Sequence, residues 1–246
     1  MKLTVPTILA FIAATSATPL PRASNPPYFI TIGDSTVATN GGWGDGFLTF
    51  VASPANGENR GKSGSTTVSW LANGRWEDLV ETINETVSDY ETIVTMQWGH
   101  NDQKSLSLDE YEENLKGIVS DIQDLGATPI IIHPLSRRNF DGDTVSEDFV
   151  EWRLRAIAAA EDSEINYLDL TTASTNYINA IGAENAETYD LSEGDGTHLN
   201  EAGGVVFGRM VADLLLEKRD DLEEYITPNE ELSEKISNGE YATGDE

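Results

Sequence analysis

The amino-acid sequence predicts an α/β fold in which helices cover both faces of a parallel β-sheet. Short runs rich in β-branched and aromatic residues recur along the chain, and each run is nearly continuous in apolar character. Strands that are buried on both faces have this character. Helical patterns with one apolar face separate the later runs. Strands that alternate with helices in this way are typical of parallel sheets covered on both sides.

The first predicted strand covers residues 28–32 and is closed by Gly33. Further strands are predicted at 92–96, 129–132 and 165–168, and a weaker one near 58–60, where the preceding turn residues leave little room. Helices are predicted at 108–125, 147–160 and 201–216, because apolar residues recur there at helical spacing. Asn200 is the expected N-cap of the last helix.

Both ends of the chain differ from this pattern. A secretory signal peptide is expected at 1–17, because a basic residue, an apolar run and small residues follow one another there, at Lys2, 5–14 and 15–17. A proline-rich leader, 18–27, precedes the predicted domain, 28–219. Residues 220–246 carry ten acidic side chains and one basic one, and we expect a solvated, partly disordered tail with a short helix around 229–236.

The composition excludes several classes of function. The chain carries 43 acidic and 15 basic side chains, a formal net charge of −28, which disfavours binding to nucleic acids and to anionic membranes. With 39% apolar residues it has enough material for the core of one domain. It has no cysteine, which excludes disulfides, thiolate catalysis and cysteine-ligated zinc. With the predicted signal peptide, we expect a soluble, secreted protein, and we further expect a monomer without a cofactor. Asn84 lies in the one glycosylation sequon of the chain.

Polar residues that follow the predicted strands carry the candidate chemistry, because ligands of open α/β sheets bind beyond the carboxyl ends of the strands. Ser35 follows the first strand in Gly33-Asp34-Ser35-Thr36, where a helix N-cap is the alternative interpretation. Asn101 follows the second long strand and can donate two uncharged hydrogen bonds to an oxyanion, although turn formation is the alternative. Residues 59–65 form a glycine-rich bend whose amides suit an anion, but its spacing does not match a nucleotide-binding P-loop.

A base for Ser35 must come from one of three histidines, His100, His133 or His198. His198 lies three residues after Asp195, a spacing that lets the carboxylate accept a hydrogen bond from the imidazole. Nucleophile, base and orienting acid are then all present. No histidine pair with metal-ligand spacing occurs. The nucleophile-elbow signature of ordinary α/β-hydrolases is also absent.

Four sequence blocks, occurring in order, resemble those of the SGNH (GDSL-type) hydrolases. They are Gly33-Asp34-Ser35, Gly64, Gly99-His100-Asn101-Asp102 and Asp195-Gly196-Thr197-His198. Through these blocks and Gly42-Trp43-Gly44, the sequence is most similar to fungal rhamnogalacturonan acetylesterases. The resemblance implies a flavodoxin-like three-layer α/β/α sandwich of about five parallel strands. It also implies Ser35 as nucleophile, His198 as base, Asp195 as orienting acid, and an oxyanion hole formed by Ser35, Gly64 and Asn101.

The resemblance therefore implies a secreted esterase that removes acetyl groups from plant cell-wall polysaccharide, with rhamnogalacturonan favoured. The alternatives are other sugar esters, such as those of xylan, and lipid or simple esters. Trp43, Trp98, His100 and Arg137 are candidate substrate-binding residues. The tryptophans suit stacking on sugar rings or packing in the core, and Arg137 with Arg138 suits either local positive charge at the crevice or a solvated loop.

Overall fold

The computed structural model describes residues 25–246 and is built on one five-stranded sheet. The strand order is β2-β1-β3-β4-β7, and every neighbouring pair is parallel. The strands are β1 (Pro27–Gly33), β2 (Asn56–Asn59), β3 (Glu91–Gln97), β4 (Thr128–Ile132) and β7 (Tyr167–Leu168). This is the order of flavodoxin-like doubly wound sheets, so the predicted fold class is confirmed.

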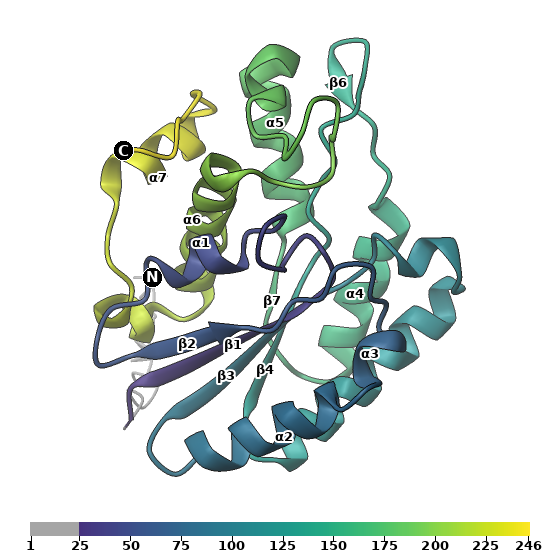
Figure 1. The fold of residues 1–246 in the computed structure, drawn as a ribbon, viewed down its shortest axis with the longest axis vertical. Coiled ribbons are helices and arrows are strands. Elements are labelled where there is room, and N and C mark those ends of the chain that lie inside the picture. The colour runs from purple at the N-terminus through teal and green to yellow at the C-terminus, as the bar shows by residue number, and fades with distance from the viewer. Residues whose placement is uncertain (1–24) are drawn as a thin grey trace, which may run out of the picture.

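Helices form a layer on each side of the sheet (Figure 1). One layer contains α2 (Arg75–Thr86), α3 (Leu108–Asp124) and α4 (Val150–Asp162). The other contains α1 (Gly44–Leu48), α5 (Leu170–Glu187, with a break at Gly182), α6 (Glu201–Lys218) and α7 (Glu230–Asn238). The central strands β1, β3 and β4 supply both cores, so that in β1 Phe29 packs with the α6 layer and Ile30 with the α3 layer.

The remaining elements are short. Three 3₁₀ turns lie at Ser69–Leu71, Asp102–Lys104 and Asp220–Tyr225, and a small hairpin pairs β5 (Phe140–Asp141) with β6 (Thr144–Val145). The predicted strands and helices match β1, β3, β4, β7, α3, α4 and α6 to within a few residues, and the weak strand is β2. Asn200 caps α6 by accepting a hydrogen bond from the Gly203 amide at 3.0 Å, as expected. The helices α2 and α5 were not predicted.

The C-terminal segment differs from the sequence expectation. Residues 220–246 are not a solvated tail, because Leu222, Ile226, Leu232 and Ala242 are buried in the same core as α6. The short helix expected within this segment is α7. A few apolar side chains at the right spacing outweigh the acidic composition, since most of the acidic side chains stay exposed and the nearly buried Glu246 is paired with Lys235. The predicted signal peptide and most of the leader lie outside the described residues.

Candidate active site

The loops that follow β1, β2 and β3 meet at the carboxyl edge of the sheet, beside the segment 190–199 that precedes α6. The turn after β1 is fixed by Asp34, whose Oδ1 accepts hydrogen bonds from the Thr36 amide at 2.9 Å and the Thr36 hydroxyl at 2.8 Å. This turn presents Ser35 at the edge of the sheet. Ser35 was predicted to lie there because polar residues at strand ends line the ligand crevice of such folds.

Ser35, His198 and Asp195 lie in one line of hydrogen bonds. Ser35 Oγ is 2.9 Å from His198 Nε2, and His198 Nδ1 is 2.9 Å from Asp195 Oδ2. The side chains of His198 and Asp195 are 35% and 25% exposed, so the line is open to solvent at one side. The geometry allows the imidazole to take the serine proton while Nδ1 keeps its own proton on the carboxylate.

Asp195 is held in its ionised form by its own loop. Burial alone would raise the pKa of this carboxyl, but hydrogen bonds from the amides of His198 and Thr197, together with the imidazole, lower it below its usual value. Asp195 Oδ1 accepts hydrogen bonds from the backbone amide of His198 at 3.0 Å and from that of Thr197 at 3.2 Å. Since the same oxygens face the ring nitrogen, the loop fixes both the charge of Asp195 and the orientation of His198.

Arg138 holds the loop of Asp195 and His198 in place from the protein interior, a role that was not predicted from the sequence. Its Nε donates to Asp190 Oδ1 at 2.8 Å, and its Nη2 donates to the carbonyls of Asp195 and His198 at 3.1 Å and 2.6 Å. The side chains of Arg138 and Asp190 are 0% and 6% exposed. The sequence offers no signal for this role, because Arg137 and Arg138 are adjacent residues of one type after the same strand.

Three hydrogen-bond donors in the segments after β1, β2 and β3 are the candidates for an oxyanion hole, namely the amides of Ser35 and Gly64 and the side chain of Asn101. Among the hydrogen bonds of the described residues, none uses the backbone amide of Ser35 or of Gly64. Gly64 has φ +79°, in the left-handed region that glycine adopts without strain. The Asn101 amide donates one hydrogen to the Ser65 carbonyl at 3.0 Å, while its oxygen accepts from Lys104 Nζ at 3.0 Å. The second hydrogen of Asn101 Nδ2 remains for a ligand.

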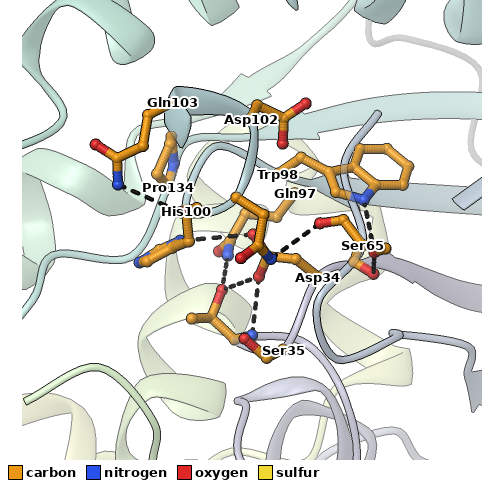
Figure 2. Close-up of polar contacts among 12 residues, drawn as sticks. Asp34, Ser35, Ser65, Gln97, Trp98, His100, Asp102, Gln103 and Pro134 are labelled. Carbon is orange, nitrogen blue, oxygen red and sulfur yellow. Dashed lines mark hydrogen bonds and ion pairs between the residues drawn. The ribbon is translucent and has the colours of Figure 1, made fainter. Parts of the chain in front are cut away.

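A buried polar network lies behind the turn that carries Ser35 (Figure 2). Gln97 Nε2 donates to the Thr36 hydroxyl, which in turn donates to Asp34. His100 Nδ1 lies 3.6 Å from the other oxygen of Asp34. Burial alone would raise the pKa of Asp34, but the attraction of the His100 imidazole and the hydrogen bonds from Thr36 lower it below its usual value. Asp34 therefore stays an acceptor and keeps the turn in place.

The structure contradicts the prediction that Trp43, Trp98 and His100 bind substrate. Both tryptophans are 0% exposed and His100 is 2% exposed. Trp43 Nε1 donates to Gln97 Oε1 at 2.9 Å, and the Trp98 ring packs edge-on against Trp70 with centroids 5.9 Å apart. These side chains are buried because the strand ends and the first turn are themselves inside the fold. They support the site from within.

Arg137 lies nearer the surface than Arg138, and its role in substrate binding stays a prediction. Its Nη1 is 3.0 Å from Asp148 Oδ2, and its guanidinium lies 5.0 Å from the centre of the Phe149 ring. Asn84 is exposed on α2. Its glycosylation likewise stays a prediction.

Within residues 25–246, no group of three or more His, Asp and Glu side chains is arranged to hold a metal ion. The same part of the chain contains no helix long and apolar enough to cross a membrane.

Known proteins resemble this chain over most of its length. The model of the GDSL-like lipase/acylhydrolase family matches residues 31–204. A probable rhamnogalacturonan acetylesterase of Bacillus subtilis, YesY, is 26% identical over 196 residues, covering 73% of this chain and 88% of YesY. The rhamnogalacturonan acetylesterase RhgT of the same organism is 26% identical over 221 residues, covering 80% of this chain and 93% of RhgT. The relatives expected from the sequence were fungal, whereas these are bacterial.

Solved structures share the fold. A Bacillus subtilis protein, YxiM, aligns with a TM-score of 0.66 at 22% identity over 80% of this chain, which spans only 57% of YxiM. An acetyl-xylooligosaccharide esterase of Geobacillus, Axe2, in a form carrying one substitution, aligns with a TM-score of 0.59 at 18% identity over 85% of this chain and 100% of Axe2.

Proposed function

Because the chain belongs to the GDSL-like lipase/acylhydrolase family and is a carboxylic ester hydrolase, we propose that it is a secreted, monomeric serine esterase that removes acetyl groups from rhamnogalacturonan. One observation carries the proposed mechanism, namely the hydrogen-bonded line from Ser35 through His198 to Asp195. An isolated serine hydroxyl is a weak nucleophile, and a base within hydrogen-bond distance activates it.

The proposed reaction has two halves. His198 Nε2 takes the proton of Ser35 Oγ while Oγ attacks the acetyl carbonyl carbon, and negative charge develops on the carbonyl oxygen. That oxygen is stabilised by the amides of Ser35 and Gly64 and by Asn101 Nδ2. His198 then gives the proton to the oxygen of the leaving sugar, and an acetyl-serine remains. Water repeats the sequence, with His198 as base, and releases acetate and free Ser35.

Two observations support a polysaccharide substrate. Two relatives that cover most of this chain are a rhamnogalacturonan acetylesterase and a probable one. The line of catalytic groups is also open to solvent rather than enclosed, with His198 35% exposed. A polymer can reach such a site without threading through the protein.

Acetylated xylan is the second candidate substrate, and the charge of the protein favours it. At −28 the protein repels a polymer rich in galacturonate, most strongly at low ionic strength. Xylan carries far less negative charge. The net charge thus opposes the substrate that the similarity to the pectic enzymes favours, and activity measurements on both polymers distinguish the two.

The test compares acetate release by the wild type and by Ser35→Ala on acetylated rhamnogalacturonan, acetylated xylan and p-nitrophenyl acetate. Release from the pectic polymer that exceeds release from xylan and disappears in Ser35→Ala is the expected result. Faster release from xylan would make acetylated xylan the substrate and leave the proposed mechanism unchanged. Activity on the small ester alone would discard the polysaccharide. Activity that survives in Ser35→Ala would overturn the mechanism itself.

A further inference from the structure

A pocket of about 340 Å³ lies on the His198 side of the candidate active site. It is formed between the loop that enters α1 and the first turn of α6. Gly41 joins this pocket to the site: its carbonyl accepts a hydrogen bond from the Leu199 amide at 2.9 Å, and a Cβ on Gly41 would lie 3.7 Å from His198 Cδ2. Gly64 and Asn101 are not among the residues that line the pocket.

The position of the pocket determines which part of a substrate it meets. The imidazole must deliver its proton to the oxygen of the leaving alcohol, so that alcohol lies beside His198. The acetyl oxygen lies on the opposite side, among the donors of Gly64 and Asn101. We propose that this pocket is a subsite for one uncharged sugar residue that adjoins the acetylated residue. This inference rests on the proposed function.

The lining gives the subsite its chemistry. Asp45 and Glu201 bring two carboxylates to the wall, and no lysine or arginine belongs to the lining, all of which the structure describes. Asp45 Oδ1 accepts from Asn59 Nδ2 at 2.7 Å, while Glu201 lies exposed in the first turn of α6. Carboxylate oxygens accept hydrogen bonds from sugar hydroxyls, and they repel the carboxylate of a uronic acid.

The size of the pocket depends on glycine at position 204. Gly204 lies inside α6, where alanine would stabilise the helix. The nearest atom to a Cβ on Gly204 is the Gly42 carbonyl oxygen at 3.3 Å, so a methyl group needs only a small shift of that loop. Gly204 and Gly42 both line the pocket. Gly204→Ala therefore adds a methyl group at its wall without removing any contact.

Two lysines lie near the donors of Gly64 and Asn101. Lys104 contacts Asn101, and the exposed Lys62 lies two residues before Gly64. A polymer in which uronic acids alternate with neutral sugars fits this arrangement in one direction. The uronate lies toward Lys62 and Lys104, and the neutral residue occupies the pocket.

The test uses three substrates: an acetylated xylo-oligosaccharide, an acetylated oligogalacturonide and p-nitrophenyl acetate. We expect the combined substitutions Asp45→Asn and Glu201→Gln to raise the ratio of kcat/KM on the oligogalacturonide to that on the xylo-oligosaccharide about tenfold at low ionic strength. In about 0.5 M salt we expect this increase to disappear, because the charges are screened. Glu77→Gln and Asp78→Asn together make the same change of charge in the first turn of α2, in the other helix layer. This control is expected to leave the ratio unchanged.

Gly204→Ala tests the pocket by its size. We expect kcat/KM on the oligosaccharides to fall at least about tenfold more than on p-nitrophenyl acetate, with thermal stability retained. Equal losses of kcat/KM on all substrates in Gly204→Ala would overturn the subsite. So would a ratio of kcat/KM on the oligogalacturonide to that on the xylo-oligosaccharide that stays within about twofold of wild type in the Asp45 and Glu201 variant.

A binding measurement separates failure of the subsite from failure of the proposed function. Calorimetric titration of Ser35→Ala with a deacetylated neutral oligosaccharide needs no turnover. Binding that Gly204→Ala weakens supports the subsite even if no ester is hydrolysed. Binding that Gly204→Ala leaves unchanged, or no binding at all, refutes it while Ser35-dependent hydrolysis of p-nitrophenyl acetate still stands.

Discussion

Arg138 should be a main determinant of both the stability of the protein and the geometry of its site. The guanidinium bonds to the Asp190 carboxylate and to the carbonyls of Asp195 and His198, all within a buried environment. Burial lowers the pKa of Arg138, and the hydrogen bond and charge of Asp190 only partly offset this. Arginine nevertheless remains charged at neutral pH.

Replacing Arg138 by Met keeps much of the side-chain volume but leaves the Asp190 carboxylate without its partner. Breaking a buried ion pair from one side costs about 3–5 kcal/mol. For a domain of this size each kcal/mol lowers Tm by about 2–4 °C, so the expected loss is roughly 6–20 °C. The two freed carbonyls also release the Asp195–His198 loop, and we expect kcat to fall at least about tenfold, since a displacement near 1 Å has larger effects in other enzymes.

The assay is thermal unfolding followed by circular dichroism, combined with kcat on p-nitrophenyl acetate. Arg137→Met is the matched control, because Arg137 is partly exposed and pairs with the partly exposed Asp148. Such a pair contributes about 1 kcal/mol or less, and its contact with Phe149 adds about as much again. Adding Asp190→Leu to Arg138→Met should restore part of the lost stability, since removing both charges leaves neither one buried alone.

Two results would refute this reasoning about Arg138. One is a Tm for Arg138→Met within about 2 °C of the wild type, well below the shift expected for a broken buried pair. The other is a larger decrease in Tm for Arg137→Met than for Arg138→Met.

Three further predictions concern other parts of the molecule. Asn101→Ala should lower kcat about 10²- to 10³-fold with little change in KM in steady-state kinetics; a loss below about tenfold would remove Asn101 from the oxyanion site. Burial alone would raise the pKa of Asp169, but hydrogen bonds from Arg153 and His133 lower it far below its usual 3.8. Its contribution to stability is therefore complete above about pH 5 and is lost as the pH falls below the usual pKa, so the Tm of Asp169→Asn should change less between pH 6 and pH 3 than that of the wild type; parallel curves would contradict this. Leu232→Ala should destabilise the protein by about 2–5 kcal/mol in urea unfolding, because Leu232 of α7 is fully buried. An unchanged urea midpoint would show that residues 220–246 do not stabilise the domain.

The fold and the line of hydrogen bonds at its edge were predictable because both depend on order along the chain. Runs such as 92–96 and 129–132 are apolar throughout, as central parallel strands require, and β3 and β4 form there. Ser35 and Asn101 follow β1 and β3, which are neighbours in the sheet, so their meeting follows from topology alone. Asp195 and His198 are three residues apart and need only one turn to come together. Within this set, the sequence order determines the spatial arrangement.

Side chains whose role depends on depth could not be assigned in the same way. Trp43 and Trp98 lie beside the predicted site in sequence, but both rings are fully buried, and Trp43 Nε1 donates to the buried Gln97. Arg137 and Arg138 are consecutive, but Arg137 pairs with Asp148, and only Arg138 donates to the carbonyls of Asp195 and His198. Leu232 is one of a few apolar residues in an acidic stretch, and its burial depends on the core that the α6 layer offers it. In each case the deciding quantity is the distance from solvent, which residue type and spacing along one chain do not specify. The hydrogen-bonded line of Ser35, His198 and Asp195 is therefore predictable, whereas the arginine that holds the loop of Asp195 and His198 in place requires the three-dimensional structure.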